Sequence, residues 1–151
     1  GKMGKVVAKL AAESPDFKIV AGVDKNISPL DFPVYSDLKD VKEEADIVID
    51  FSYHEAVPNL LKAALEKKLP VVIATTGLSD EELNVIKEAS KEIPIFKSAN
   101  MSLGINILIN LVKEAAKILQ QDFDIEIIEK HHNMKKDAPS GTALMLSLIH
   151  I

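Results

Sequence analysis

Cysteine and tryptophan are absent from this chain of 151 residues, and aromatic side chains make up only 5% of it. Without cysteine the chain can form neither a disulfide framework nor a thiolate metal site. Its four histidines show no HExxH-type spacing, so we expect no bound metal. A composition free of cysteine also suits a reducing cytosol, and we expect a cytoplasmic protein.

Positive charge is in short supply as well. Lysine and arginine together number 18 against 23 aspartates and glutamates, which gives a net charge of −5. This balance argues against a general nucleic-acid binder, which is usually basic. No apolar run reaches the roughly 18 residues that a membrane span needs, and no signal peptide is visible. We therefore expect a small-molecule partner and neither nucleic acid nor membrane.

Apolar residues are plentiful, at 47% of the chain, and their spacing alternates over the first hundred residues. Segments with apolar residues at helical spacing alternate with nearly continuous apolar runs. We expect helices over residues 5–14, 55–68 and 79–91, and strands over residues 17–24, 45–52, 70–76 and 93–96. Ser79 and Glu82, three residues apart, predict a capping box at the start of the third helix. Strands that alternate with helices predict parallel βαβ units, and hence an α/β, Rossmann-like doubly wound sheet with ligands at the carboxyl ends of its strands.

The pattern changes after residue 98. Residues 104–120 predict a long amphipathic helix, and the alternation over residues 123–128 predicts a strand with one wet face, as in an open mixed sheet. The apolar stripe expected on the helix comprises Ile105, Leu108, Val112, Ala115 and Leu119. We expect a dinucleotide-binding domain over 1–98 and the start of an α+β substrate-binding, catalytic and oligomerisation domain over 99–151.

Both ends of the chain fall inside expected elements. The chain opens on Gly-Lys-Met-Gly, which resembles the back half of a glycine-rich nucleotide loop, and it stops within an apolar run. We therefore expect a fragment that lacks the first strand of the nucleotide domain and the C-terminal part of the second domain.

Two features near the start predict a nucleotide. A glycine-containing turn before a helix presents backbone amides to a pyrophosphate, and the residues in question are Gly1, Lys2, Met3 and Gly4. Asp24 ends the next expected strand, where a carboxylate binds the adenosine ribose hydroxyls. Lys25 is a cation that can hold a 2′-phosphate, so both NADH and NADPH stay open. The alternatives are a plain tight turn and a solvated lysine.

Small polar residues follow other expected strands. Thr75 and Thr76 precede Gly77 at the end of one strand, and this fold places such a loop at the nicotinamide pocket. Asn100 is either a turn residue or a partner of the cofactor amide. Neither loop is decisive without the other features.

Residues 129–143 combine two adjacent histidines, three lysines and a Pro-Ser-Gly-Thr turn. Proton donors, positive charge and exposed amides suit an anionic substrate that must be protonated. His131 and His132 follow an expected strand, so they should point in different directions. Lys135 lies four residues beyond the first of them. The alternative is a basic surface loop.

A helix should open at the end of this segment. Ser140 is the expected N-cap, and the free amides of Gly141 and Thr142 would then form a carboxylate site. The alternative is an ordinary cap with no ligand.

These residues resemble one family, the 4-hydroxy-tetrahydrodipicolinate reductases (dihydrodipicolinate reductases). The matching segments are GKMG at 1–4, DFS at 50–52, ATTG at 74–77, SANMSLGIN at 98–106 and EKHHNMKKDAPSGTA at 129–143. The resemblance implies reduction of a cyclic dicarboxylate by NADH or NADPH to tetrahydrodipicolinate, in the diaminopimelate route to lysine. It also implies a homotetramer at full length.

The resemblance further implies roles for single residues. His131 would donate the proton with the help of Lys135, His132 would contact the substrate, and Gly141 and Thr142 would bind a substrate carboxylate. The implied cofactor-binding positions are Gly1, Lys2, Met3, Gly4, Asp24, Lys25, Ala74, Thr75, Thr76, Ser98, Ala99, Asn100 and Met101.

Two rival hypotheses stay open. Another dehydrogenase on the same scaffold, such as an aspartate-dehydrogenase-like or sugar-type enzyme, would share the nucleotide half. The HHxxK pattern followed by DAPSGT argues against it. A nucleotide-binding module without catalysis would bind NADH and never turn over.

Overall fold

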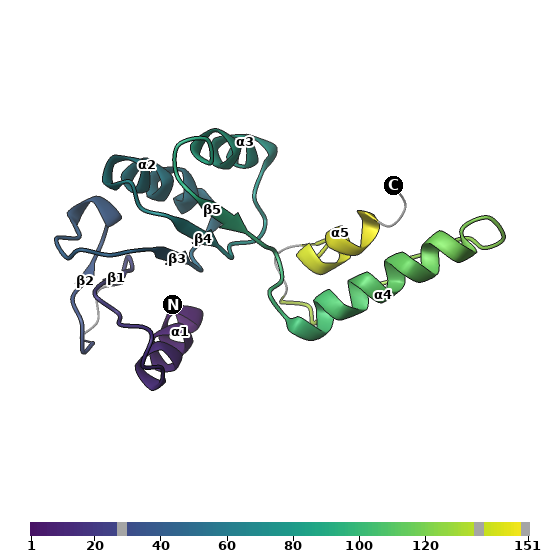
Figure 1. Cartoon of the computed structure of the whole chain (residues 1–151), viewed down its shortest axis with the longest axis horizontal. Coiled ribbons are helices and arrows are strands. Elements are labelled where there is room, and N and C mark those ends of the chain that lie inside the picture. Colours follow the sequence, from purple (N-terminus) through teal and green to yellow (C-terminus); the bar gives the residue numbers. More distant parts are fainter. Residues whose placement is uncertain (27–29, 135–137, 149–151) are drawn as a thin grey trace. The chain divides into compact units, whose positions relative to one another are not determined.

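The computed structural model describes residues 1–26, 30–134 and 138–148. Contacts between residues divide the chain into a first unit, Gly1–Lys97, and a second unit, Ser98–Ile151. Figure 1 colours the elements of both units along the sequence. The dinucleotide-binding and substrate-binding roles expected for the two halves of the chain stay predictions.

The strands described in the first unit all pair in parallel. β3 (Val48–Asp50), β4 (Val71–Ile73) and β5 (Ile95–Lys97) form one sheet in that order. β1 (Gly22–Val23) pairs with β2 (Val34–Tyr35) in a second sheet. Helices lie between β2 and β3, between β3 and β4, and between β4 and β5, which confirms the expected α/β class.

The strands are shorter than expected, and among the described residues they form two sheets where one was predicted. The apolar runs at 17–24 and 45–52 contribute only two and three paired residues, respectively. An apolar run predicts that a segment favours extended structure, but a strand exists only where a neighbouring strand accepts and donates its backbone hydrogen bonds.

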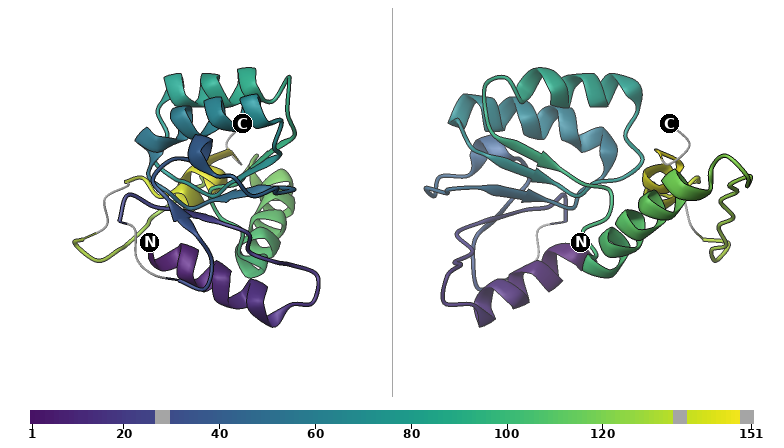
Figure 2. Two further views of the ribbon diagram at one scale, coloured as in Figure 1. Left: turned by 90° about the vertical axis from the view of Figure 1, so that its left-hand side faces the viewer. Right: turned by 45° about the vertical axis from the view of Figure 1, so that its right-hand side comes forward.

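Two helices cover one face of the three-stranded sheet. α2 (Val57–Lys67) follows the short helix η2 (His54–Ala56), and α3 (Asp80–Ala89) follows β4. Figures 1 and 2 show both helices on the same side of the sheet and α1 on the opposite side. The side chains of η1 (Leu38–Asp40) extend the packing at one end of α2.

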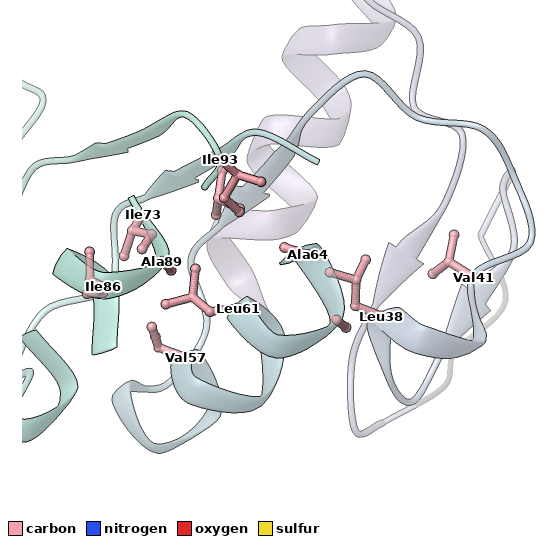
Figure 3. Close-up of a cluster of buried hydrophobic side chains, with 11 residues drawn as sticks. Leu38, Val41, Val57, Leu61, Ala64, Ile73, Ile86, Ala89 and Ile93 are labelled. Atoms are coloured by element: carbon pink, nitrogen blue, oxygen red, sulfur yellow. The ribbon is translucent and has the colours of Figure 1, made fainter. Parts of the chain in front are cut away.

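The hydrophobic core lies between these helices and the sheet (Figure 3). Its largest fully buried side chains come from α2 and β4, and they are Val57, Leu61, Val71 and Ile73. Ile86 and Ala89 of α3 close the cluster. Burying a side chain of this size stabilises the fold by about 1.5–3 kcal/mol, so this layer holds the strand ends in place.

The start of α3 has the predicted capping box. The Ser79 hydroxyl accepts from the Glu82 amide at 3.2 Å, and the Glu82 carboxylate accepts from the Ser79 amide at 2.7 Å. His54 lies 3.0 Å from the same carboxylate through Nδ1. The imidazole therefore ties η2 to the first turn of α3.

α1 (Lys2–Glu13) begins earlier than expected. The predicted loop at Lys2, Met3 and Gly4 is instead the first helical turn, and Gly1 is the N-cap. Lysine and methionine are good helix formers, and the Lys5 amide already donates to the Gly1 carbonyl at 3.3 Å. The prediction of a loop at residues 1–4 was therefore wrong. The helix that was expected to follow this loop is present and begins at Lys2.

The second unit contains α4 (Leu103–Leu119) and α5 (Gly141–Ser147), which contact each other. Residues 123–128 form no paired strand within the part of the chain that the structure describes, so the strand predicted there was wrong. The predicted side-chain alternation is present in the sequence, but no strand is assigned to these residues.

The buried face of α4 also differs from the predicted stripe. Ile109 and Ala116 are buried, whereas Leu108, Ala115 and Leu119 of the expected stripe are exposed. The helix is apolar on more than one side, so periodicity alone does not select the face that packs. Among the described residues, no helix is long and apolar enough to cross a membrane.

Candidate functional site

The start of α1 and the end of β1 meet in the first unit. The Gly1 amino nitrogen lies 2.5 Å from Asp24 Oδ2, and the Asn26 amide donates to Asp24 Oδ1 at 2.8 Å. These two contacts, the amino group first, hold the pKa of the Asp24 carboxyl below its usual value. Lys25 is exposed beside it. The structure thus brings the two predicted nucleotide-binding features together.

The helix start itself is suited to an anion. The first amides of an α-helix have no partner four residues earlier, and here they belong to Lys2, Met3 and Gly4, the residues expected at the pyrophosphate. No side chain caps them. Free amides, which can bind a phosphate, therefore lie beside a carboxylate, which can bind ribose hydroxyls.

The loops after β3 and β4 are joined by a buried hydrogen-bond network. The Thr75 hydroxyl donates to Asp50 Oδ2 at 2.7 Å, and the Ser52 amide donates to Asp50 Oδ1 at 3.0 Å. The Thr75 hydroxyl also lies 3.3 Å from the Ser52 carbonyl oxygen. Asp50 is 3% exposed and Thr75 is 4% exposed. The predicted cofactor residue Thr75 therefore directs its side chain inward.

The residues that follow Thr75 are the ones at the surface. Thr76 and Gly77 are exposed, and Ala74 is half-buried with its amide bonded to the Asp50 carbonyl at 2.9 Å. Gly77 has a φ of +73°, a conformation that favours glycine. Sequence reasoning included Asp50 in the DFS segment of the family resemblance but assigned the aspartate no role. An acidic residue that ends an apolar run was the available signal.

A polar turn opens the second unit. Asn100 accepts from the Ser102 amide at 2.8 Å and donates through Nδ2 to the Thr142 hydroxyl at 2.7 Å. Ser98 donates to the Asn100 carbonyl at 2.9 Å, while Met101 is exposed. A residue predicted for the cofactor and one predicted for the substrate are thus hydrogen-bonded to each other across 42 positions of sequence.

Close packing accompanies this hydrogen bond. A Cβ added to Gly141 would lie 2.7 Å from the Ala99 Cβ, which is closer than real contacts of this kind. Glycine at 141 therefore lets the start of α5 approach residue 99 closely. The Ser140 hydroxyl accepts from the Ala143 amide at 3.1 Å, which confirms the predicted N-cap.

A cavity of about 340 Å³ lies beside this helix start. His131 lines it, together with Glu129, Lys130, Ser140 and Thr142. Apolar side chains complete the lining, namely Ile105, Ile127, Ile128, Ala143 and Leu146. All these residues belong to the second unit, so its own elements build the hollow.

Glu129 connects the histidine to the helix start. Its carboxylate accepts from the Ser140 amide at 2.9 Å and lies 3.5 Å from His131 Nδ1. A carboxylate therefore lies on the Nδ1 side of the His131 ring and beside the start of α5. The sequence showed Glu129 within the signature segment but did not single it out.

The other residues predicted around the histidine pair differ in their placement. His132 is exposed and accepts from the Met134 amide at 3.2 Å through Nδ1, and it is not among the residues that line the cavity. This agrees with the expectation that the two rings point in different directions. Lys135, predicted to act with His131, lies outside the described residues.

The fold and the site together indicate a class of protein. Parallel βαβ units with a helix start beside an acidic strand end are typical of α/β proteins that bind dinucleotides. A histidine held by a carboxylate in a cavity adds a group that can transfer a proton.

Comparisons with known proteins give the family. The family model described as dihydrodipicolinate reductase, N-terminus, matches residues 1–101, and the one described as dihydrodipicolinate reductase, C-terminus, matches residues 104–149. The chain belongs to the dihydrodipicolinate reductase family, which confirms the resemblance read from its motifs.

Individual relatives agree. A 4-hydroxy-tetrahydrodipicolinate reductase of Caldanaerobacter subterraneus subsp. tengcongensis is 79% identical over 147 residues, which are 97% of this chain and 58% of the relative. One of Clostridium tetani is 55% identical over 148 residues, with the same shares of 97% and 58%. The chain thus spans less than two thirds of the length of these relatives.

A solved structure supports the fold. The dipicolinate-bound dihydrodipicolinate reductase from Paenisporosarcina sp. TG-14 superposes with a TM-score of 0.69 at 26% identity. The match covers 99% of this chain and 61% of that one.

Proposed function

We propose that this chain forms the cofactor-binding and proton-donating part of a 4-hydroxy-tetrahydrodipicolinate reductase. The reaction is the NAD(P)H-dependent reduction of this cyclic dicarboxylate to tetrahydrodipicolinate, in which the hydroxyl group leaves as water, in the diaminopimelate route to lysine. The observation that carries the proposal is the cavity in which His131 lies 3.5 Å from Glu129, which in turn binds the Ser140 amide. Family membership and the names of the relatives support it.

The histidine is the proposed acid. Reduction leaves a carbon that must be protonated, and a positioned general acid supplies this proton. Glu129 holds the Nδ1 side of His131, so we assign the transfer to Nε2. Lys135 is proposed to assist, and His132 is proposed to contact the substrate from the outer side of the loop.

The carboxylates of the substrate need hydrogen-bond donors from the protein. Gly141 and Thr142 at the start of α5 are proposed to bind one carboxylate, supported by the position of Thr142 in the cavity lining. Dipicolinate, bound to the relative of known structure, is a dicarboxylate of the same class.

A nicotinamide dinucleotide would supply the hydride. The residues present fit it, because free amides at the start of α1 and the Asp24 carboxylate lie together. Lys25 is exposed beside Asp24 and is available to a 2′-phosphate, so NADH and NADPH are both proposed. The further cofactor positions proposed are Ala74, Thr75, Thr76, Ser98, Ala99, Asn100 and Met101. The proposed assembly is a homotetramer.

The test uses an extended protein, in which this chain carries the flanking segments of its Caldanaerobacter relative. Substrate is generated in place from pyruvate and aspartate semialdehyde by the preceding synthase, and NADH and NADPH oxidation is followed. We expect turnover in the extended protein. His131→Gln should lower kcat by roughly 10²–10⁴-fold, the usual contribution of general acid catalysis.

The matched control is His132→Gln, one residue away and outside the cavity lining. We expect it to raise KM more than it lowers kcat, because a substrate contact is not the proton source. Tight NADH binding without any turnover by a folded protein would contradict the reductase and favour a binding module. Equal loss of kcat in both variants would contradict the role given to His131.

A further inference from the structure

Asp50 is a buried carboxylate with no assigned part in binding or chemistry. It ends β3 and is 3% exposed. Burial of such a group is costly unless hydrogen bonds satisfy it. Its donors in the described part of the chain are both neutral, namely the Ser52 amide at 3.0 Å and the Thr75 hydroxyl at 2.7 Å.

These bonds connect two loops that follow neighbouring strands. Ser52 lies just after β3, and Thr75 lies just after β4. The last rung between the two strands, from the Ala74 amide to the Asp50 carbonyl, is 2.9 Å long. The side-chain network therefore continues the strand pairing beyond the point where the backbone ladder ends.

The geometry also restricts what Thr75 can do. Its hydroxyl carries one proton, which is directed to Asp50, and its side chain is 4% exposed. The exposed neighbours that a ligand can reach are Thr76 and Gly77 on one loop and Phe51, Ser52 and Tyr53 on the other. The buried pair thus determines where the exposed residues lie.

We propose that Asp50 is a positioning residue, which fixes the loops after β3 and β4 by holding the Thr75 hydroxyl and the Ser52 amide, and that Thr75 supports nicotinamide-nucleotide binding through Asp50 and not by its own contact. The proposal rests on the proposed function, because it takes these loops as part of the cofactor site. It assigns the direct contacts to the exposed residues of both loops.

The chain contains a matched control. Asp37 accepts from the Lys39 amide at 3.0 Å and from Asn59 Nδ2 at 2.9 Å, which is again one amide two residues on and one distant side chain. It differs from Asp50 in that Lys39 Nζ also lies 3.7 Å from its carboxylate. It lies at the start of η1, away from the two loops. Asp37→Ala therefore reports the effect of losing such a network for structural reasons alone.

The experiment measures the dissociation constants of NADH and NADPH by fluorescence titration of the extended protein, together with its Tm. Thr75→Val removes the hydroxyl and should weaken binding of both nucleotides by roughly threefold to tenfold, which corresponds to one hydrogen bond. Thr75→Ser keeps the hydroxyl and should bind within about twofold of the parent, by the same scale. Asp37→Ala should leave both constants unchanged.

Asp50→Asn sharpens the test. The amide can still accept from Ser52 and can donate to the Thr75 oxygen, whose proton then turns to the Ser52 carbonyl 3.3 Å away. A positioning role predicts near-parental nucleotide binding in this variant. A large loss in Asp50→Asn with none in Thr75→Val would overturn the proposal, since it would mean that the charge acts directly on the ligand.

The outcomes separate this proposal from the proposed function. Unchanged dissociation constants in Thr75→Val, with a lower Tm as in Asp37→Ala, would overturn the positioning role and leave the reductase intact. Nucleotide binding by the parent without turnover would overturn the reductase, while the Thr75→Val and Thr75→Ser pair would still decide the role of Asp50. An extended protein that binds no nucleotide would overturn both.

Discussion

The two units differ in how far they bury their apolar side chains. In the first unit, α2, α3 and β4 bury a continuous cluster that includes Leu61 and Ile73 at 0% exposure. In the second unit, α4 buries only Ile109 and Ala116, while large side chains such as Leu111 and Ile118 are 64% and 78% exposed. Packing thus holds the strand ends of the first unit, whereas specific polar contacts hold the candidate site of the second.

Two hydrogen bonds illustrate the polar contacts of the second unit. Asn100 bonds to Thr142, and Glu129 bonds to Ser140. A hydrogen bond of this kind contributes about 0.5–1.5 kcal/mol, less than one fully buried leucine. The comparison therefore predicts that substitutions in the hydrophobic core lower stability most in the first unit. In the second unit, substitutions at the close contacts around α5 should lower stability most.

The largest effect is expected from the core of the first unit. Leu61→Ala should lower the free energy of unfolding of the chain by about 2–5 kcal/mol, because it leaves a cavity among fully buried neighbours. Leu111→Ala in α4 is the matched control and should change it by at most about 0.5 kcal/mol. Urea denaturation followed by circular dichroism measures both. Similar losses in the two variants would remove the contrast between the units.

A smaller effect is expected at the start of α5. Gly141→Ala places a methyl group 2.7 Å from the Ala99 Cβ and should destabilise this contact by about 1–3 kcal/mol through overpacking. Gly104→Ala, whose nearest atom would be 3.9 Å away, should stabilise α4 by up to about 1 kcal/mol. Hydrogen exchange at the Leu144 amide, which bonds to the Ser140 carbonyl, provides the readout. Unchanged exchange in Gly141→Ala would show that α5 is not held against residue 99.

The smallest effect concerns pH and the first turn of α3. The Ser79 amide, followed by His54, holds the pKa of the Glu82 carboxyl below its usual value of 4.5. Because the folded pKa is depressed, the stabilisation is present above pH 4.5 and is lost as the pH falls through the folded pKa. Glu82→Gln should therefore flatten the acid side of the stability profile. We expect a smaller change from Glu114→Gln, which removes only an exposed ion pair with Lys117 in α4.

Sequence patterns succeeded where the determining contacts are local. The capping box of Ser79 and Glu82 and the N-cap at Ser140 were predicted correctly, because each depends on residues three positions apart. The α/β class followed from the alternation of apolar runs with helical spacing. The family followed from short motifs, most of all the segment at 129–143.

Some predictions that needed a distant partner were wrong. Residues 123–128 have the side-chain alternation of a strand, yet no strand is assigned to them. The predicted stripe of α4 was right in part, since Ile105 and Val112 are half-buried, but Leu108, Ala115 and Leu119 are exposed and Ile109 and Ala116 are the buried residues. Periodicity gives the conformation of a segment, but it carries no information about which neighbour arrives to cover it.

The sequence by itself determined the local conformations, the family and the residue types available for proton transfer and anion binding. The tertiary structure decided which of these residues meet. It joined Asn100 to Thr142, placed Glu129 between His131 and α5, and turned Thr75 away from the surface toward Asp50. The physical reason is that hydrogen bonds and packing act over a few ångströms in space, whatever the distance between their partners along the chain.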